Sequence, residues 1–81
     1  MYRLEIYLLR GCPYSIQLEK DLRHYRKHKS RVFVRWLNRS DKEYMSLKKR
    51  FHHPTYPIVV LFWKKNVVWV GGRQEFISIL T

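Results

Sequence analysis

Hydrophobic residues recur along the first third of the chain with two different periods. Leu4, Ile6 and Leu8 stand at every second position, which is the period of a strand with one buried face. This strand is predicted over residues 3–9. From residue 13 to about residue 29 the spacing becomes helical. The hydrophobic residues of this segment, most of which fall on one side of a helix, are Ile16, Leu18, Leu22 and Tyr25.

The next hydrophobic segment, residues 31–37, is rich in β-branched and aromatic residues and predicts a second strand. The predicted helix lies between the two strands. Because parallel strands need a crossover of this kind, whereas antiparallel strands can be joined by a tight turn, we expect the two strands to be parallel. The first part of the chain therefore predicts a βαβ unit.

A second helix is predicted after the second strand. Ser40 is followed three residues later by Glu43, the spacing of a capping box, in which the two side chains bond to backbone N–H groups of the first turn. We therefore expect this helix to open at Ser40. It carries the hydrophobic residues Tyr44, Leu47 and Phe51, and it ends at residues 52–54.

The remaining residues predict a hairpin and a closing helix. Residues 58–63 form an uninterrupted hydrophobic run, which is typical of a strand buried on both faces. A short polar turn follows, and residues 67–70 return as an antiparallel strand. Gly71 and Gly72 then allow a sharp change of direction into a helix over residues 73–80.

The order of elements is thus β-α-β-α-β-β-α, with no repeat or linker, and we expect residues 1–81 to form one domain. A hydrophobic content of 46% suffices for one core. The single cysteine excludes the class of secreted domains that internal disulfides hold together, and it suits a reducing compartment. The start of the chain has no signal-peptide pattern, and the longest hydrophobic run is too short to cross a bilayer. We therefore expect a soluble, cytoplasmic protein with no membrane partner.

The chain is strongly basic, with 17 Lys and Arg against 6 Asp and Glu and a formal net charge of +11. Such a charge attracts nucleic acid, anionic membranes or acidic small molecules without selecting among them. His24 and His28 stand four residues apart on the first predicted helix, but the sequence offers no third ligand beside them. No metal site is predicted.

Cys12 stands at the predicted start of the first helix, and this position gives its thiol a chemical role. Pro13 suits the first helical position, where its missing N–H costs nothing. The free N–H groups of the first turn and the helix dipole stabilise negative charge, and Arg10 adds a nearby cation. We therefore expect Cys12 to form a thiolate readily, as a reactive thiol rather than a buried hydrophobic residue.

Three motifs, in this order on the predicted elements, resemble those of the glutaredoxin family. They are Gly11-Cys12-Pro13-Tyr14-Ser15 after the first strand, Thr55-Tyr56-Pro57 before the third, and Gly71-Gly72 followed by Glu75 at the last helix. The resemblance covers nearly the whole chain. It implies an α/β thioredoxin-like fold with a four-stranded mixed sheet and three helices.

The resemblance also implies which residues act. Cys12 would be the nucleophile, Pro57 would follow a cis peptide bond, and the backbone of Tyr56 would pair with glutathione. The residues implied to bind glutathione are Arg10, Tyr14, Lys48, Lys49, Tyr56, Pro57, Gly72, Gln74 and Glu75. The chain departs from the family in having Glu75 where an aspartate is usual, and Leu9 where a lysine or arginine usually precedes the nucleophile by three residues.

Ser15 replaces the second cysteine of two-thiol family members, and a hydroxyl cannot resolve a mixed disulfide. The resemblance therefore implies a monothiol enzyme. Cys12 would take the glutathionyl group from a glutathionylated protein, and a second glutathione would regenerate the thiol. Glutathione would be a co-substrate, the partners would be glutathionylated or disulfide-containing proteins, and we expect a monomer. Ser15 could also donate a hydrogen bond to the thiolate.

Two other functions remain open from the sequence. The first is a carrier of an iron–sulfur cluster bridged by glutathione, which Pro13 disfavours because cluster-assembling family members generally have a small residue after the cysteine. The second is a basic binding module on the same scaffold. No nucleic-acid motif accompanies the lysines and arginines, so only weak, nonspecific binding to nucleic acid is expected from them.

Overall fold

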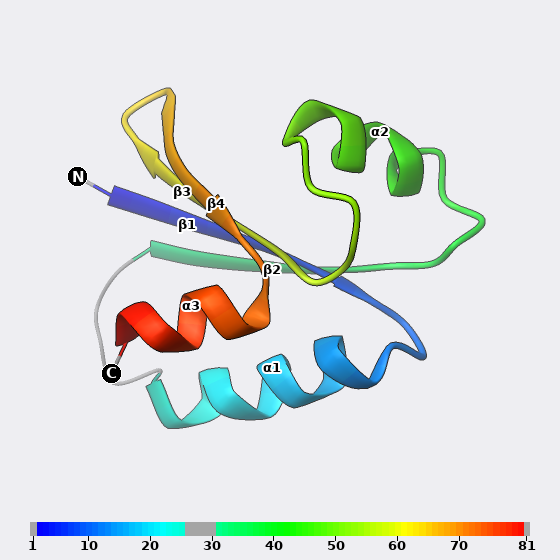
Figure 1. Cartoon of the computed structure of the whole chain (residues 1–81), viewed down its shortest axis with the longest axis horizontal. Helices are drawn as coiled ribbons and strands as arrows, with labels where there is room; N and C mark the ends of the chain where they lie inside the picture. The colour runs from blue at the N-terminus through cyan, green and yellow to red at the C-terminus, as the bar shows by residue number, and fades with distance from the viewer. Residues whose placement is uncertain (1, 26–30, 81) are drawn as a thin grey trace.

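The computed structural model describes residues 2–25 and 31–80, and it has the predicted order of elements (Figure 1). The elements are β1 (Tyr2–Leu9), α1 (Pro13–Tyr25), β2 (Arg31–Leu37), α2 (Glu43–Arg50), β3 (Ile58–Trp63), β4 (Asn66–Gly71) and α3 (Arg73–Leu80). The predicted continuation of α1 toward residue 29, with His28, lies outside the described residues. None of the described helices combines the length and the hydrophobicity needed to cross a membrane.

The four strands form one mixed sheet in the order β2-β1-β3-β4. β1 and β2 are parallel, with Leu9 paired to Leu37 at their carboxyl ends, which confirms the βαβ prediction. β3 is antiparallel to β1 and to β4. Helices α1 and α3 lie on one face of the sheet and α2 lies on the other (Figure 1).

Each face of the sheet has its own hydrophobic cluster, and β3 contributes to both because its side chains alternate between the faces. Val59 packs with α1 and α3, whereas Ile58, Val60 and Phe62 pack with α2. The predicted burial of this strand on both faces is confirmed. By contrast, the edge strand β2 is mostly exposed, and Phe33 retains 55% of its accessible surface.

The buried face of α1 differs in one residue from the face that its pattern predicts. Leu18 and Leu22 are buried against Ile6 and Leu8 as expected, whereas Ile16 is 42% exposed. Ser15 takes the buried position one turn before Leu18 and is fully buried. A prediction from the spacing of hydrophobic residues places Ile16 on the buried face. It cannot identify Ser15 as buried, because serine is polar.

The predicted start of α2 at Ser40 is wrong. The helix begins at Glu43, its cap residue is Lys42, and that residue makes no side-chain cap hydrogen bond. The Asp41 carboxylate accepts a hydrogen bond from the Asn38 N–H at 2.8 Å, so residues 38–41 form a turn of their own. A local side-chain bond of this kind competes with the helical first turn that a capping box requires.

Gly71 ends β4 beneath the Trp69 indole. A Cβ placed on Gly71 would lie 2.4 Å from Trp69 Cη2, so the indole can occupy this position only because residue 71 has no side chain. Trp69 also contacts Phe76 of α3, with ring centroids 6.4 Å apart. This contact helps to fix α3 against the hairpin.

Candidate functional site

Cys12 lies in the tight turn that joins β1 to α1. Its N–H donates to the Leu9 carbonyl at 3.2 Å, and its carbonyl accepts from the Ile16 N–H at 3.0 Å, so Cys12 directly precedes the helix. Gly11 has a φ of 78° in this turn, a conformation that favours glycine. The turn therefore places the thiol at the N-terminal end of α1, as the sequence predicts. Cys12 is a free, partly buried cysteine.

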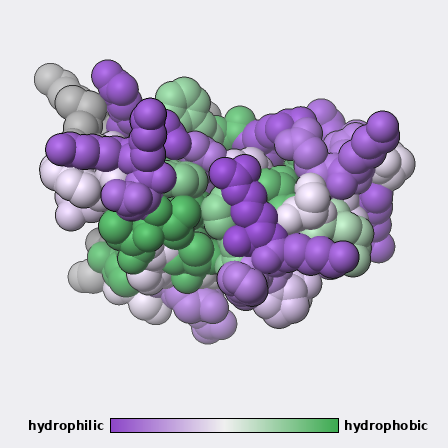
Figure 2. All heavy atoms as spheres, turned by 90° about the horizontal axis from the view of Figure 1, so that it is seen from above, coloured by the Kyte–Doolittle hydropathy of each residue, from purple (hydrophilic) through white to green (hydrophobic). Residues whose placement is uncertain are grey.

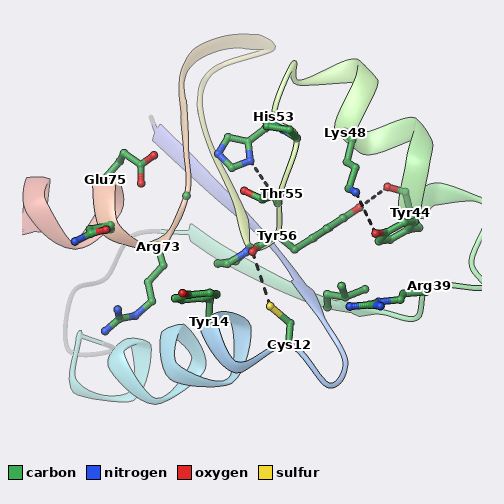
Figure 3. A pocket seen from close by; sticks show the side chains of 15 residues that line it. Cys12, Tyr14, Arg39, Tyr44, Lys48, His53, Thr55, Tyr56, Arg73 and Glu75 are labelled. Atoms are coloured by element: carbon green, nitrogen blue, oxygen red, sulfur yellow. Dashed lines mark hydrogen bonds between the residues drawn. The ribbon is translucent and has the colours of Figure 1, made fainter.

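The Cys12 thiol faces the segment that enters β3. Its Sγ lies 3.9 Å from the carbonyl oxygen of Tyr56, to which the thiol can donate (Figure 3). The Tyr56–Pro57 peptide bond is cis, as the resemblance implies. The backbone of Tyr56 therefore borders the thiol directly.

Ser15 is turned away from the thiol and into the protein. Its hydroxyl accepts a hydrogen bond from the Leu9 N–H at 3.0 Å, and its side chain is fully buried. Among the described residues, no hydrogen bond joins the Ser15 side chain to Cys12. Ser15 thus secures the end of β1 beneath the turn that carries the thiol, which differs from the expectation that it could bond to the thiolate.

Two stacked tyrosines connect the segment that enters β3 to α2. The Tyr44 and Tyr56 rings are nearly parallel, with centroids 5.3 Å apart, and the Tyr56 hydroxyl donates to the Tyr44 carbonyl at 2.7 Å. Burial raises the pKa of Tyr56. The stack therefore fixes the Tyr56 backbone relative to the helix that carries Lys48.

Lys48 points from α2 toward the same space. Its Nζ donates to the Tyr44 hydroxyl at 3.0 Å and lies 4.4 Å from the centroid of the Tyr44 ring. This hydrogen bond is the main reason that the pKa of Tyr44 is lowered, and the positive charge of Arg39 acts in the same direction. Lys48 on α2 and Arg39 on the loop after β2 are therefore both close enough to lower the pKa of the Tyr44 hydroxyl.

The N-terminal end of α3 forms the opposite side of the site. The Gly72 carbonyl accepts from the Phe76 N–H at 3.0 Å and starts the helix. Arg73 forms an ion pair with Asp21 of α1 at 2.9 Å. A Cβ on Gly72 would come within 3.3 Å of Glu75 Oε2 and within 3.4 Å of His53 Cε1, so space beside this residue is limited.

These elements enclose a cleft of about 420 Å³ beside the thiol (Figure 3). It is lined by Leu9, Cys12, Tyr14, Arg39, Tyr44, Lys48, His53, Pro54, Thr55, Tyr56, Pro57, Gly72, Arg73, Gln74 and Glu75. Arg39 and Lys48 lie on the α2 side of Cys12, whereas Glu75 lies on the α3 side. Arg73 also lies on the α3 side, paired with Asp21 of α1, so among the described residues the α2 side carries two cations without an ion pair and the α3 side carries charges of both signs.

The structure brings most of the predicted site residues into this lining. They are Cys12, Tyr14, Lys48, Tyr56, Pro57, Gly72, Gln74 and Glu75. Arg10 and Lys49 are exposed and lie outside the lining, as do Pro13 and Ser15 of the Cys12 motif. No group of three or more metal-binding side chains occurs among residues 2–25 and 31–80.

Four further charged or aromatic residues line the cleft but were not predicted as site residues: Arg39, Tyr44, His53 and Arg73. Arg39 could have been found, because it follows the carboxyl end of β2, and parallel strands place functional residues at their carboxyl ends. The His53 ring is oriented by a 2.6 Å contact between its Nδ1 and the Thr55 carbonyl. No sequence pattern indicates that contact, which depends on the path of the loop after α2.

A second hollow, of about 410 Å³, lies where α3 meets the hairpin and the start of β1. Its lining is hydrophobic and consists of Tyr2, Leu4, Leu61, Val68, Trp69, Phe76 and Ile79. No nucleophile or charged side chain belongs to this lining, so the cleft beside Cys12 is the better candidate for chemistry.

Comparison with known proteins places the fold. No family model and no curated protein matches the sequence. Thioredoxin f2 from Chlamydomonas reinhardtii matches with a TM-score of 0.70 and 12% identity, over 98% of this chain and 75% of that one. A thioredoxin from Thermus thermophilus matches with a TM-score of 0.61 and 22% identity, over 98% of this chain and 70% of that one. A malarial protein matches with a TM-score of 0.66 and 13% identity, over 99% of this chain and 93% of that one. The chain therefore has the predicted thioredoxin-like fold.

Proposed function

We propose that this protein is a glutathione-dependent thiol–disulfide oxidoreductase that reduces protein–glutathione mixed disulfides with one thiol. The observation that carries the proposal is the position of Cys12: a free thiol at the N-terminal end of α1, 3.9 Å from the Tyr56 carbonyl and on the lining of the cleft. The thiolate of such an accessible cysteine is the attacking species in disulfide exchange.

The cleft suits an extended ligand that carries carboxylates and an ammonium group, as glutathione does. The backbone of Tyr56 would pair with the cysteinyl part of the tripeptide, in the manner of an added strand. Lys48 would bind the glycyl carboxylate through a charge-assisted hydrogen bond. At the other end, the first N–H groups of α3 would bind the γ-glutamyl carboxylate, and Glu75 would bind its ammonium group.

In the first step, the Cys12 thiolate attacks the glutathionyl sulfur of the mixed disulfide. A new S–S bond forms between Cys12 and glutathione, and the protein substrate leaves as a thiolate that takes a proton from water. In the second step, a glutathione thiolate attacks the glutathionyl sulfur on Cys12. Oxidised glutathione leaves, and Cys12 returns as a thiolate. Holding glutathione in the cleft would align its sulfur, rather than the substrate's, for attack.

The test is turnover of a small glutathione mixed disulfide, coupled to reduction of the oxidised glutathione formed. Cys12→Ser is expected to abolish turnover while leaving the circular dichroism spectrum unchanged, because the partly exposed Sγ has the Tyr56 carbonyl as its polar contact. Mass spectrometry of the parent protein should detect one glutathionyl adduct, on Cys12. No turnover by the parent protein, or equal turnover by Cys12→Ser, would contradict the proposal.

A further inference from the structure

Two arginines come together at the end of the sheet where Cys12 lies. Leu9 and Leu37 are paired at the carboxyl ends of β1 and β2, and the Arg10 N–H donates to the Leu37 carbonyl at 2.9 Å. Arg39 follows Leu37 by two residues and lines the cleft. Both arginines are exposed. Parallel pairing thus brings two cations, far apart in sequence, to the β2 side of the thiol.

The acidic residues of the chain bond mostly to other groups. Four of the six form ion pairs elsewhere, Glu5 with Arg3, Glu19 with Arg23, Asp21 with Arg73 and Glu43 with Arg35, and Asp41 accepts from the Asn38 N–H. The sixth, Glu75, lies on the α3 side of the cleft. Within residues 2–25 and 31–80, no ion pair involves Arg10, Arg39 or Lys48.

Glutathione would not use all of this positive charge. In the mode proposed above, Lys48 and the start of α3 bind the two carboxylates, and Glu75 binds the ammonium group. Arg39 then remains on the lining of the cleft, and the backbone bond from Arg10 to Leu37 brings residue 10 to the same end of the sheet. A protein substrate joined to glutathione through its cysteine would meet both arginines if it approached from this rim.

We propose that Arg10 and Arg39 select protein substrates whose glutathionylated cysteine is flanked by acidic residues. The inference rests on the proposed function and names its substrate class. Cations placed beside a reacting centre raise the rate of encounter with acidic partners by about 10-fold to 1,000-fold at low salt. The same cations repel basic partners, so the selection acts in both directions.

The experiment uses three glutathionylated peptides that differ only in the residues flanking their single cysteine, which are Glu, Gln or Lys. At low ionic strength we expect kcat/KM to fall in the order Glu, Gln, Lys, with a ratio of about 10 or more between the first and the last. At about 0.5 M salt the ratio should approach one, because exposed charges are then screened over a few ångströms. Equal rates for the three peptides at low salt would overturn the inference.

Two double variants separate a local effect from a general effect of net charge. Arg10→Gln with Arg39→Gln removes two charges at the rim, and Lys64→Gln with Lys65→Gln removes two charges from the turn after β3. Because β3 has 6 residues and its other end adjoins Pro57, that turn lies about 20 Å from the cleft. The two variants are compared at about 0.15 M ionic strength, where the screening length is about 8 Å and charges at the turn act little on the cleft. The rim variant should lose most of the Glu-to-Lys ratio and the turn variant should keep it. An equal loss in both variants would overturn the inference.

The ratio of kcat/KM for the Glu-flanked and Lys-flanked peptides is calculated separately for each variant. A substitution that changes the activity toward all peptides equally therefore leaves this ratio unchanged. Turnover of the Gln-flanked peptide by the parent protein reports on the proposed function itself. If none of the peptides is reduced, the proposed function fails and takes the inference with it. If all three are reduced at the same rate, the proposed function stands and the substrate selection alone fails.

Discussion

Cys12, which directly precedes α1, and Ser15, in the first turn of α1, have different environments. The thiol borders the cleft, whereas the serine hydroxyl is fully buried and accepts from the Leu9 N–H. The serine at this position is therefore a structural hydrogen-bonding residue, whatever the redox chemistry of its neighbour.

The Ser15 hydroxyl should contribute measurably to the stability of the fold. In Ser15→Ala the buried Leu9 N–H loses its acceptor, and an unsatisfied buried donor costs about 1–3 kcal/mol. Urea denaturation should show this loss in the free energy of unfolding. The control is Ser46→Ala, on the exposed face of α2, for which a change within about 0.5 kcal/mol is expected. Equal stability of the two variants would show that the buried hydrogen bond is dispensable.

Lys48 and Lys49 provide a second comparison, because only Lys48 lines the cleft. If Lys48 binds a carboxylate of glutathione, Lys48→Met should raise the KM for glutathione about tenfold with a smaller change in kcat, since a hydrogen bond to a charged group is worth about 1.5–3 kcal/mol. Lys49→Met removes the same charge from an exposed position and should leave KM within about twofold. Steady-state kinetics with varied glutathione measures both. A similar KM for the two variants would remove Lys48 from the binding site.

Among the elements, the helices show how far periodicity alone can go. The bounds of β2 and α3 agree with the sequence prediction, because strong hydrophobic patterns and a Gly-Gly step delimit them. The start of α2 was not predictable from the Ser40–Glu43 spacing, since Asp41 forms a competing turn with Asn38. Local side-chain hydrogen bonds of this kind determine where a helix begins. The same Ser-to-Glu spacing occurs both in a capping box and in a turn that precedes the helix.

The buried face of α1 can be tested directly. Leu18 is fully buried between the helix and the sheet, so Leu18→Ala should lower the free energy of unfolding by about 2–5 kcal/mol. Ile16→Ala changes a residue that is 42% exposed on the same helix and should shift stability by only about 0.5 kcal/mol. Thermal or urea unfolding of the two variants provides the comparison. Equal losses would place Ile16 in the core, as the helical period alone suggests.

The candidate site was predictable wherever a motif marks it and unpredictable wherever the fold assembles it. Cys12 and Pro57 were identified from local motifs, and the structure brings both to one cleft. Arg39 can be inferred from its place after the carboxyl end of β2, whereas His53 reaches the same cleft from the loop after α2, and its approach depends on how that helix packs against the sheet. Tertiary contacts of this kind leave no period or spacing in the sequence.

At the scale of the whole molecule, positive charge is the dominant surface property. Long hydrophilic side chains extend over much of the face seen from above, and a cluster of hydrophobic side chains lies exposed beside them (Figure 2). With a formal net charge of +11 on 81 residues, the folded state concentrates like charges that the unfolded chain holds further apart. Repulsion among these charges should oppose folding.

Screening this repulsion should stabilise the protein. Raising sodium chloride from about 20 mM to about 300 mM shortens the screening length severalfold. A gain of about 1 kcal/mol would raise the melting temperature by about 4–8 °C in a domain of this size. The Lys64→Gln and Lys65→Gln double variant, which has two fewer positive charges, should show a smaller rise. A melting temperature that falls with salt would mean that the ion pairs outweigh the repulsion.

The indole that rests on Gly71 limits how this chain can evolve. A methyl group at residue 71 would displace Trp69, whose ring adjoins Phe76 of the helix that begins at the cleft. A mutation on the hairpin would therefore be transmitted, through two aromatic rings, to the end of the cleft that Glu75 occupies. In any descendant that keeps Trp69, we expect glycine at this position to be inherited unchanged, and we expect the tryptophan and the glycine to be lost only together.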